Sequence, residues 1–208
     1  MRSKASNVKE RKNVMKTISL LLAGMLLAGC AGNGELLKRA ESPERSNVFT
    51  VVTSATPPEH GFADLTIRSS IKTHHPSPFP LVNDPHGTSQ YVLLINIDGE
   101  PLRIPGTPAI EEGGSDAERH PEAGDGIRYL FRTHLRLTAG THRVIVAIPE
   151  DRVAVQRDIR LVEMTDSLLE ATPSYYSDRR QLGPGSAGAT SFKEGISGLD
   201  LSLNGKAF

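Results

Sequence analysis

Apolar and polar residues alternate along several segments after residue 47, and this period of two predicts β-strands. The segment Ala63–Thr73 shows it well, because one face carries Ala63, Leu65, Ile67, Ser69 and Ile71. Further strands are expected over Val48–Thr53, Val153–Glu163 and Ile196–Leu203. The pattern therefore predicts a chain built mainly of strands.

The segment Tyr91–Ile97 is almost continuously apolar. Such a run suits a strand that is buried on both faces in the middle of a sheet. It ends at Asp98–Gly99, a dipeptide typical of tight turns. We therefore expect a central strand that is closed by a turn at these two residues.

Two segments with a clear alternation, residues 127–137 and 144–148, predict a β-hairpin. The turn is expected at Ala139–Gly140. With this turn Leu135 faces Val144, and both side chains lie on the core face, whereas a slip of one residue would oppose core face to solvent face.

Proline and glycine interrupt the alternation in two long segments, residues 74–89 and 105–126, which we expect to be loops. A single helical turn is expected near Asp166–Ala171, and a Gly/Ser-rich linker at 183–191. About seven strands and almost no helix are predicted over residues 48–208. This content favours an all-β fold, a single antiparallel two-sheet sandwich of the immunoglobulin-like type.

Residues 1–29 have the pattern of a signal peptide. Basic residues precede an uncharged, mostly apolar run from Ile18 to Ala28. The run is too short for a transmembrane helix, which needs about 20 apolar residues. Met15, which with Lys16 and this run would begin a complete shorter signal peptide, is a candidate for the true start.

The apolar run ends in Leu27-Ala28-Gly29-Cys30, which resembles the lipobox of bacterial lipoproteins. The resemblance implies cleavage before Cys30 and attachment of acyl chains to this residue, the only cysteine in the chain. Ala31 stands where an Asp would signal retention at the inner membrane, so the outer membrane is favoured in a host that has one. Residues 30–47, which are polar and contain glycines, are expected to form a flexible tether.

The charge of the exported part differs from that of the whole chain. Without residues 1–29, 18 Lys and Arg residues and 23 Asp and Glu residues remain, which gives a net charge of −5. A modest negative charge argues against nucleic acid as a partner and against electrostatic binding of a polybasic segment to anionic lipid. Membrane attachment is therefore expected through the lipid on Cys30 alone.

A second resemblance involves the turn at Asp98–Gly99. The segment Ile95-Asn-Ile-Asp-Gly99, followed later by Leu137-Thr-Ala-Gly-Thr-His-Arg-Val-Ile-Val146, is similar to PEGA modules of bacterial surface proteins. In these modules a strand ends in a DG turn and a later strand opens with G-x-H-x-V. The similarity covers Tyr91–Pro149 and is interrupted by the long loop at 105–126. It implies a small β-sandwich with an interaction or structural role, and a protein partner in the envelope.

Histidines gather in one proline-rich stretch, where His74, His75 and His86 follow His60. Imidazole is a common ligand of zinc and copper, so the alternative function is metal or ligand binding by this loop. None of these residues has ligand spacing on a defined strand or helix, and solvated loop histidines are the simpler interpretation. We therefore expect no metal and no cofactor.

Catalytic motifs are missing from the sequence. Neither G-x-S-x-G nor H-E-x-x-H occurs, and the one S-x-x-K match after the signal peptide, Ser69–Lys72, lies on an expected strand where its two ends point to opposite faces. The acidic residues of the loop at 105–126 lack the regular order of a calcium loop. The sequence thus predicts a lipid-anchored envelope protein that is not an enzyme, with a structural or partner-binding role.

Overall fold

The computed structural model describes residues 32–53, 56–76, 84–112, 120–177 and 190–208. The chain divides into two compact units, Met1–Glu35 and Leu36–Phe208. Of the first unit only the start of a helix is described, so the expected signal peptide and Cys30 lie outside the described residues. In the described part, no helix has the length and apolar character that crossing a membrane requires.

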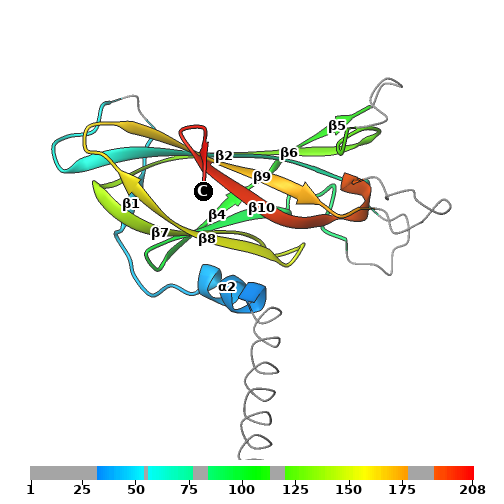
Figure 1. The fold of residues 1–208 in the computed structure, drawn as a ribbon, viewed down its shortest axis with the longest axis horizontal. Helices are drawn as coiled ribbons and strands as arrows, with labels where there is room; N and C mark the ends of the chain where they lie inside the picture. The colour runs from blue at the N-terminus through cyan, green and yellow to red at the C-terminus, as the bar shows by residue number, and fades with distance from the viewer. Residues whose placement is uncertain (1–31, 54–55, 77–83, 113–119, 178–189) are drawn as a thin grey trace, which may run out of the picture. The chain divides into compact units, whose positions relative to one another are not determined.

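The second unit is mostly β and contains two sheets (Figure 1). The larger sheet has seven strands in the order β1-β6-β2-β9-β10-β11, and β5 also pairs with β6. These strands are β1 (Phe49–Val51), β2 (Phe62–Thr73), β5 (Thr107–Glu111), β6 (Gly126–Thr138), β9 (Asp166–Tyr175), β10 (Ile196–Leu203) and β11 (Lys206–Ala207).

The smaller sheet has four antiparallel strands in the order β4-β3-β7-β8. They are β3 (Val92–Ile97), β4 (Glu100–Pro105), β7 (Gly140–Ile148) and β8 (Val153–Leu161). The helices in the described residues are α2 (Gly32–Glu41) and the short 3₁₀ helix η2 (Phe192–Glu194).

The two sheets share one apolar core. Inward-facing residues of both sheets belong to a single cluster of buried side chains, among them Leu65 and Phe131 from the larger sheet and Ile95 and Val146 from the smaller one. Tyr91, which directly precedes β3, packs its ring 4.6 Å from the ring of Tyr129 on β6. Burial of these alternating apolar faces is the main source of stability for the fold.

Part of the outer face of the smaller sheet is also apolar, and the end of α2 covers this part. Ala40 is fully buried there against Leu94 and Ile145, while Leu36 and Leu37 pack at the margin. Five of the six residues of β3 are therefore buried, and β3 lies between β4 and β7. This confirms the expected central strand with two buried faces.

The helix corrects one prediction for the segment between residues 30 and 47. The sequence there predicted a flexible tether, but Gly32–Glu41 forms a helix. Its few apolar residues, Leu36, Leu37 and Ala40, are spaced to lie on one helical face, and they gain stability only because β3 and β7 offer an apolar surface.

The predicted hairpin across Ala139–Gly140 is wrong. The strands β6 and β7 form as expected, but β6 pairs with β2 and β7 pairs with β3 and β8, so the chain changes sheets between them. Leu135 lies opposite Leu65, and Val144 lies opposite Ile97. Alternation shows which face of a strand points to the core, but strands of facing sheets satisfy it as well as paired neighbours do.

The region expected to hold a helical turn near Asp166–Ala171 is part of strand β9. Its residues alternate between buried and more exposed positions, which is the period of a strand. Strand β9 runs parallel to β2, from the pair Asp64–Asp166 to the pair Ser69–Ala171, so the larger sheet is mixed rather than wholly antiparallel.

Eleven strands are present in the described residues, compared with about seven predicted. One of the additional strands, β5, lies inside the segment 105–126 that was expected to be a loop. Four of its five residues are exposed, so its sequence carries no alternating apolar signal. In the loop predicted at 74–89, the described residues 74–76 and 84–89 contain no helix or strand, as expected.

Candidate functional site

The turn between β3 and β4 binds the start of β7 through one carboxylate. Asp98 and Gly99 have positive φ angles of 50° and 98°, which suit a tight two-residue turn. One oxygen of Asp98 lies 2.7 Å from His142 Nδ1, and the other accepts a hydrogen bond of 2.8 Å from the backbone N–H of Arg143. The expected turn is therefore confirmed, and it is tied to a residue 44 positions away.

His142 is buried and has a partner for each ring nitrogen. Its Nε2 atom lies 2.8 Å from the carbonyl oxygen of Thr138, in addition to the contact between Nδ1 and Asp98. Both partners are acceptors, so the ring makes both hydrogen bonds when each nitrogen carries a hydrogen. His142 thus connects the turn at Asp98 with the end of β6.

Asn96 fastens helix α2 to the same turn. Its side-chain amide donates a hydrogen bond of 3.0 Å to the carbonyl oxygen of Arg39, and its oxygen accepts one of 2.8 Å from the N–H of Gly99. The carbonyl oxygen of Gly99 accepts hydrogen bonds from the N–H groups of Glu44 and Arg45. The last carbonyls of a helix lack partners within it, and the hydrogen bond from Asn96 satisfies one of them, that of Arg39.

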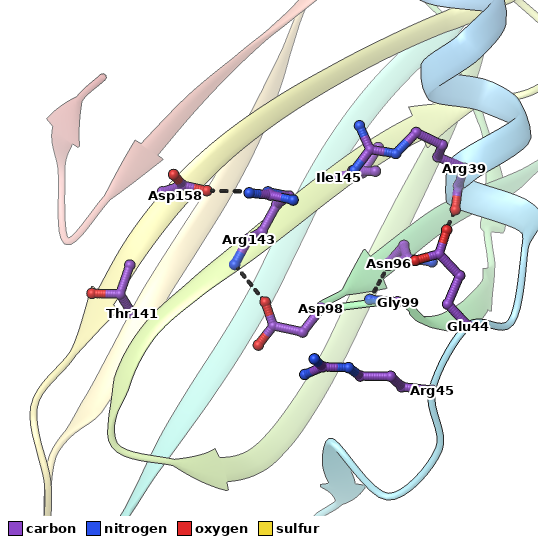
Figure 2. Close-up of a pocket in the computed structure, with 10 residues that line it drawn as sticks. All are labelled: Arg39, Glu44, Arg45, Asn96, Asp98, Gly99, Thr141, Arg143, Ile145 and Asp158. Atoms are coloured by element: carbon purple, nitrogen blue, oxygen red, sulfur yellow. Dashed lines mark hydrogen bonds and ion pairs between the residues drawn. The ribbon is translucent and has the colours of Figure 1, made fainter.

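A hollow of about 320 Å³ lies beside these residues on the outer side of the smaller sheet (Figure 2). Figure 2 shows Arg143 between Asp98 and Asp158, with a distance of 3.7 Å from Arg143 Nε to Asp158 Oδ1. The hollow is lined by Arg39, Glu44, Arg45, Asn96, Asp98, Gly99, Thr141, Arg143, Ile145 and Asp158. Both signs of charge are present, so the hollow suits a polar partner segment better than a single anion or cation.

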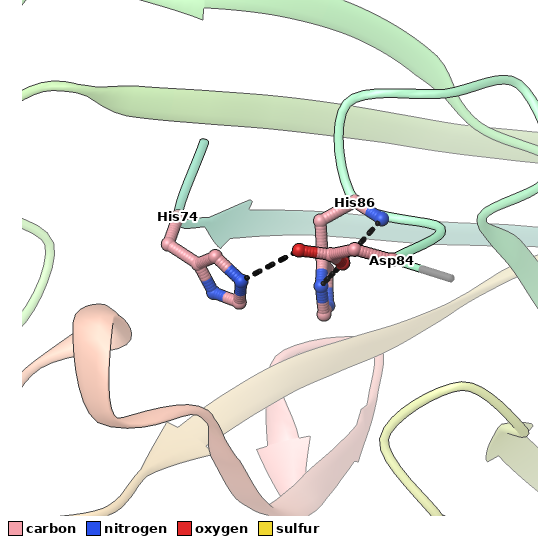
Figure 3. Close-up of side chains that lie close together, drawn as sticks. All are labelled: His74, Asp84 and His86. Atoms are coloured by element: carbon pink, nitrogen blue, oxygen red, sulfur yellow. Dashed lines mark hydrogen bonds and ion pairs between the residues drawn. The ribbon is translucent and has the colours of Figure 1, made fainter. Parts of the chain in front are cut away.

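A second group of polar side chains lies in the histidine-rich loop (Figure 3). His74 directly follows β2, and its Nε2 atom lies 3.2 Å from Asp84 Oδ2. His86 Nδ1 lies 2.6 Å from Asp84 Oδ1, which also accepts a 3.0 Å hydrogen bond from the backbone N–H of His86. Figure 3 shows the Asp84 carboxylate facing both imidazole rings.

Glycine allows the two parts of this loop to approach closely. Gly87 has a φ angle of 79°, and an added Cβ there would lie 2.8 Å from Pro76 Cδ, too close for any side chain. The next residue, Thr88, accepts a hydrogen bond of 2.9 Å from the hydroxyl of Tyr129 through its carbonyl oxygen. Close packing of the loop brings His86 beside His74, with ring centroids 4.4 Å apart.

Asp151 lies on the other side of the His86 ring. Its Oδ1 atom is 3.7 Å from His86 Nε2, and its Oδ2 atom accepts a hydrogen bond of 2.6 Å from the hydroxyl of Tyr91. Burial lowers the pKa of His86, but the carboxylates of Asp151 and Asp84 outweigh it and hold this pKa above its ordinary value. Burial, reinforced by Asp151, raises the pKa of the Tyr91 hydroxyl, which therefore stays protonated and remains a donor.

The structure separates the histidines that the sequence grouped. His74 and His86 lie together, whereas His75 and His60 are exposed and lie outside this group. Asp84 is the member that sequence reasoning missed. The only signal in the sequence that could have indicated Asp84 was its position two residues before His86.

The acidic residues and the S-x-x-K match that the sequence offered as further candidates form ion pairs and hydrogen bonds with neighbouring residues. Glu111, from the acidic loop that was considered for calcium, binds Arg128 and Lys72 instead, and Glu122 binds Arg128. Within the S-x-x-K match, Ser69 donates a hydrogen bond to the carbonyl oxygen of Ala171. Lys72 donates a hydrogen bond to the carbonyl oxygen of Gly124, so Ser69 and Lys72 have different partners.

No protein-family model, curated protein sequence or solved structure matches this chain. Its function therefore has to be inferred from its own residues. Two places carry chemistry in the described residues: the contact of Asp98 with His142 beside the hollow, and the group formed by His74, Asp84 and His86.

Proposed function

We propose that this protein is a lipid-anchored, non-enzymatic component of a bacterial cell envelope. Its strands form a PEGA-like β-sandwich that has a structural or partner-binding role. The lipid is attached to Cys30, and the outer membrane is the favoured location in a host with two membranes. Loops or an edge strand contact a protein partner, and nucleic acid is not a partner.

The contact of Asp98 with His142 is the observation that carries the proposal. The resemblance to PEGA modules rests on two short segments, a DG turn and a later G-x-H-x-V strand. If their similarity were accidental, these two segments would not need to be neighbours in the fold. The 2.7 Å contact between the aspartate of the first and the histidine of the second supports a common structural unit. The similarity to PEGA modules in turn favours an interaction or structural role.

The anchor is tested by expressing the full chain in a bacterium as wild type, as Cys30→Ala and as the control Ser42→Ala. We expect wild type and control to carry acyl mass in intact-mass spectra and to fractionate with membranes. Cys30→Ala should lack the acyl mass and leave the membrane fraction. Equal mass gain and equal fractionation of all three would show that Cys30 holds no lipid.

The partner-binding role is tested with a photo-crosslinking amino acid at two exposed positions. Asp158 lies on the edge strand β8, whereas Arg68 lies on β2 and is paired on both sides, with β6 and with β9. An edge strand has unpaired backbone groups that a partner can use, so we expect a discrete crosslinked protein from position 158 and none from position 68. The same pattern from both positions, or no product from either, would contradict binding at this edge.

A further inference from the structure

We propose that His74, Asp84 and His86 form a binding site for a divalent transition metal, with Zn²⁺ as the ion to test. The proposal is independent of the lipid anchor and of the PEGA resemblance. It rests on the placement of three ligand atoms and on a second carboxylate behind one of the imidazoles.

The three ligand atoms are spaced for one ion. One atom from each residue can be chosen so that all lie within 4.8 Å of one another. Zinc binds such atoms at about 2.0–2.2 Å, which places neighbouring ligands of a tetrahedral site roughly 3.3 Å apart. His74 Nε2 and Asp84 Oδ2 are already 3.2 Å apart. Small side-chain rotations would therefore complete the ligand set.

The ligand types select the class of metal. Two imidazole nitrogens and one carboxylate oxygen suit zinc and its neighbours in the first transition series. Calcium and magnesium prefer sites made entirely of oxygen atoms. Three protein ligands also leave a coordination position for water or another small ligand.

Asp151 and Tyr91 provide the support that metal-binding histidines usually have. When one ring nitrogen binds a metal, the other typically donates to a carboxylate, which fixes the orientation of the ring. His86 has its Nδ1 atom toward Asp84 and its Nε2 atom 3.7 Å from Asp151. Asp151 is itself held by the hydroxyl of Tyr91, whose side chain is fully buried. The orientation of His86 is thus determined before any metal arrives.

The site is also mostly shielded from water, while one ligand remains accessible. The side chains of Asp84 and His86 are 10% and 12% exposed, and that of His74 is 42% exposed. An ion could therefore enter from the side of His74. A network of hydrogen bonds without metal would use the same three residues, and the two interpretations differ in whether zinc binds.

The experiment uses the full, untagged chain in detergent, since a histidine tag would bind zinc. Equilibrium dialysis against Zn²⁺ is followed by metal analysis for wild type, His74→Ala, Asp84→Asn and the control His75→Ala. We expect one tightly bound zinc in wild type and in the control. His74→Ala and Asp84→Asn should each weaken binding at least about tenfold, the smallest loss typical even of groups that only support a ligand.

Thermal unfolding with and without Zn²⁺ supplies a second measurement. Zinc should raise the unfolding temperature of wild type and of His75→Ala, but not that of Asp84→Asn, because an ion that binds only the folded state stabilises it. If Asp84→Asn does not fold, His74→Ala, at a partly exposed position, takes its place in the same measurement, and zinc should not raise its unfolding temperature. Absence of tight zinc binding to wild type, or equal binding by wild type and His74→Ala, would overturn the proposal.

Discussion

The carboxylate of Asp98 accepts from two groups in a turn where its own backbone has a positive φ angle. Asp98→Ala would remove both interactions and place alanine at a φ of 50°, which alanine adopts less readily than asparagine or aspartate. We expect the free energy of unfolding in urea to fall by about 1–3 kcal/mol, the usual cost of leaving buried groups without partners.

Two further variants make this prediction specific. Asp98→Asn should cost less than Asp98→Ala, because asparagine tolerates the turn conformation and still offers an acceptor. Asp158→Ala removes only an exposed contact with Arg143 and should change stability by less than about 0.5 kcal/mol. Equal losses for Asp98→Ala and Asp158→Ala would contradict the role assigned to Asp98.

Asp64 makes the free energy of unfolding depend on pH in the acidic range. It is 3% exposed and binds Arg136 through both oxygens, at 2.7 and 2.9 Å. The hydrogen bonds from Arg136 outweigh burial and hold the pKa of Asp64 below its ordinary value of 3.8. Because the folded pKa is lower than the unfolded one, this stabilisation is present above pH 3.8 and is lost as the pH falls through the folded pKa.

Urea unfolding as a function of pH tests this assignment. Wild type should lose stability more steeply below pH 3.8 than Asp64→Asn, which cannot bind the proton. Arg136→Met should weaken the same acid dependence, because it removes the main cause of the lowered pKa. Identical acid profiles for wild type and Asp64→Asn would show that another carboxylate is responsible.

At the level of single residues, the sequence predicted part of each candidate site. Asp98–Gly99 was predicted as a turn, because few dipeptides tolerate those backbone angles. His74 and His86 were identified as possible ligands, but His75 was grouped with them and Asp84 was not. In a loop without regular period, the direction of a side chain depends on packing such as that of Gly87 against Pro76, which no local pattern encodes.

Individual elements were easier to predict than their partners. The alternation along β2, β6 and β7 arises from burial of one face, and it identified these strands. It could not show that β6 and β7 lie in different sheets, because both arrangements bury the same residues. Strand β9 was mistaken for a helical turn, since its run of Ser167, Leu168 and Leu169 contains no strict alternation of apolar and polar types.

Helix α2 was missed because its stability comes from the sheet beneath it. Ala40→Asp would place a carboxylate against Leu94 and Ile145. We expect the helix to detach, its backbone amides to lose protection from hydrogen exchange, and the free energy of unfolding to fall by about 2–4 kcal/mol, the value of burying one or two leucines.

Lys38→Gln is the matched control for this prediction, because it changes the charge by the same single negative unit in the same turn at an exposed position. It should leave the exchange of the helix amides close to that of wild type. If both variants release the helix to the same degree, charge near the helix end rather than packing of Ala40 holds it in place.

For the molecule as a whole, the docked end of α2 shortens the connection to the proposed anchor. Leu36 is six positions after Cys30, and a chain of six steps spans at most about 20 Å, compared with roughly 60 Å for an 18-residue flexible tether. A flexible Gly/Ser insertion after Ala31 should keep lipidation and the fold unchanged. It should reduce crosslinking from position 158 if the partner is bound to the same membrane, and an undiminished yield would place the partner elsewhere.

The parallel pairing of β2 with β9 also has a consequence for how quickly the protein folds. Ser69 and Ala171, which share a hydrogen bond, are 102 residues apart in the chain. Such distant segments must meet before the larger sheet is complete, and topologies of this kind fold slowly. A newly made chain with this topology stays unfolded for longer. The order of the strands would therefore leave time for the proposed export before the chain folds.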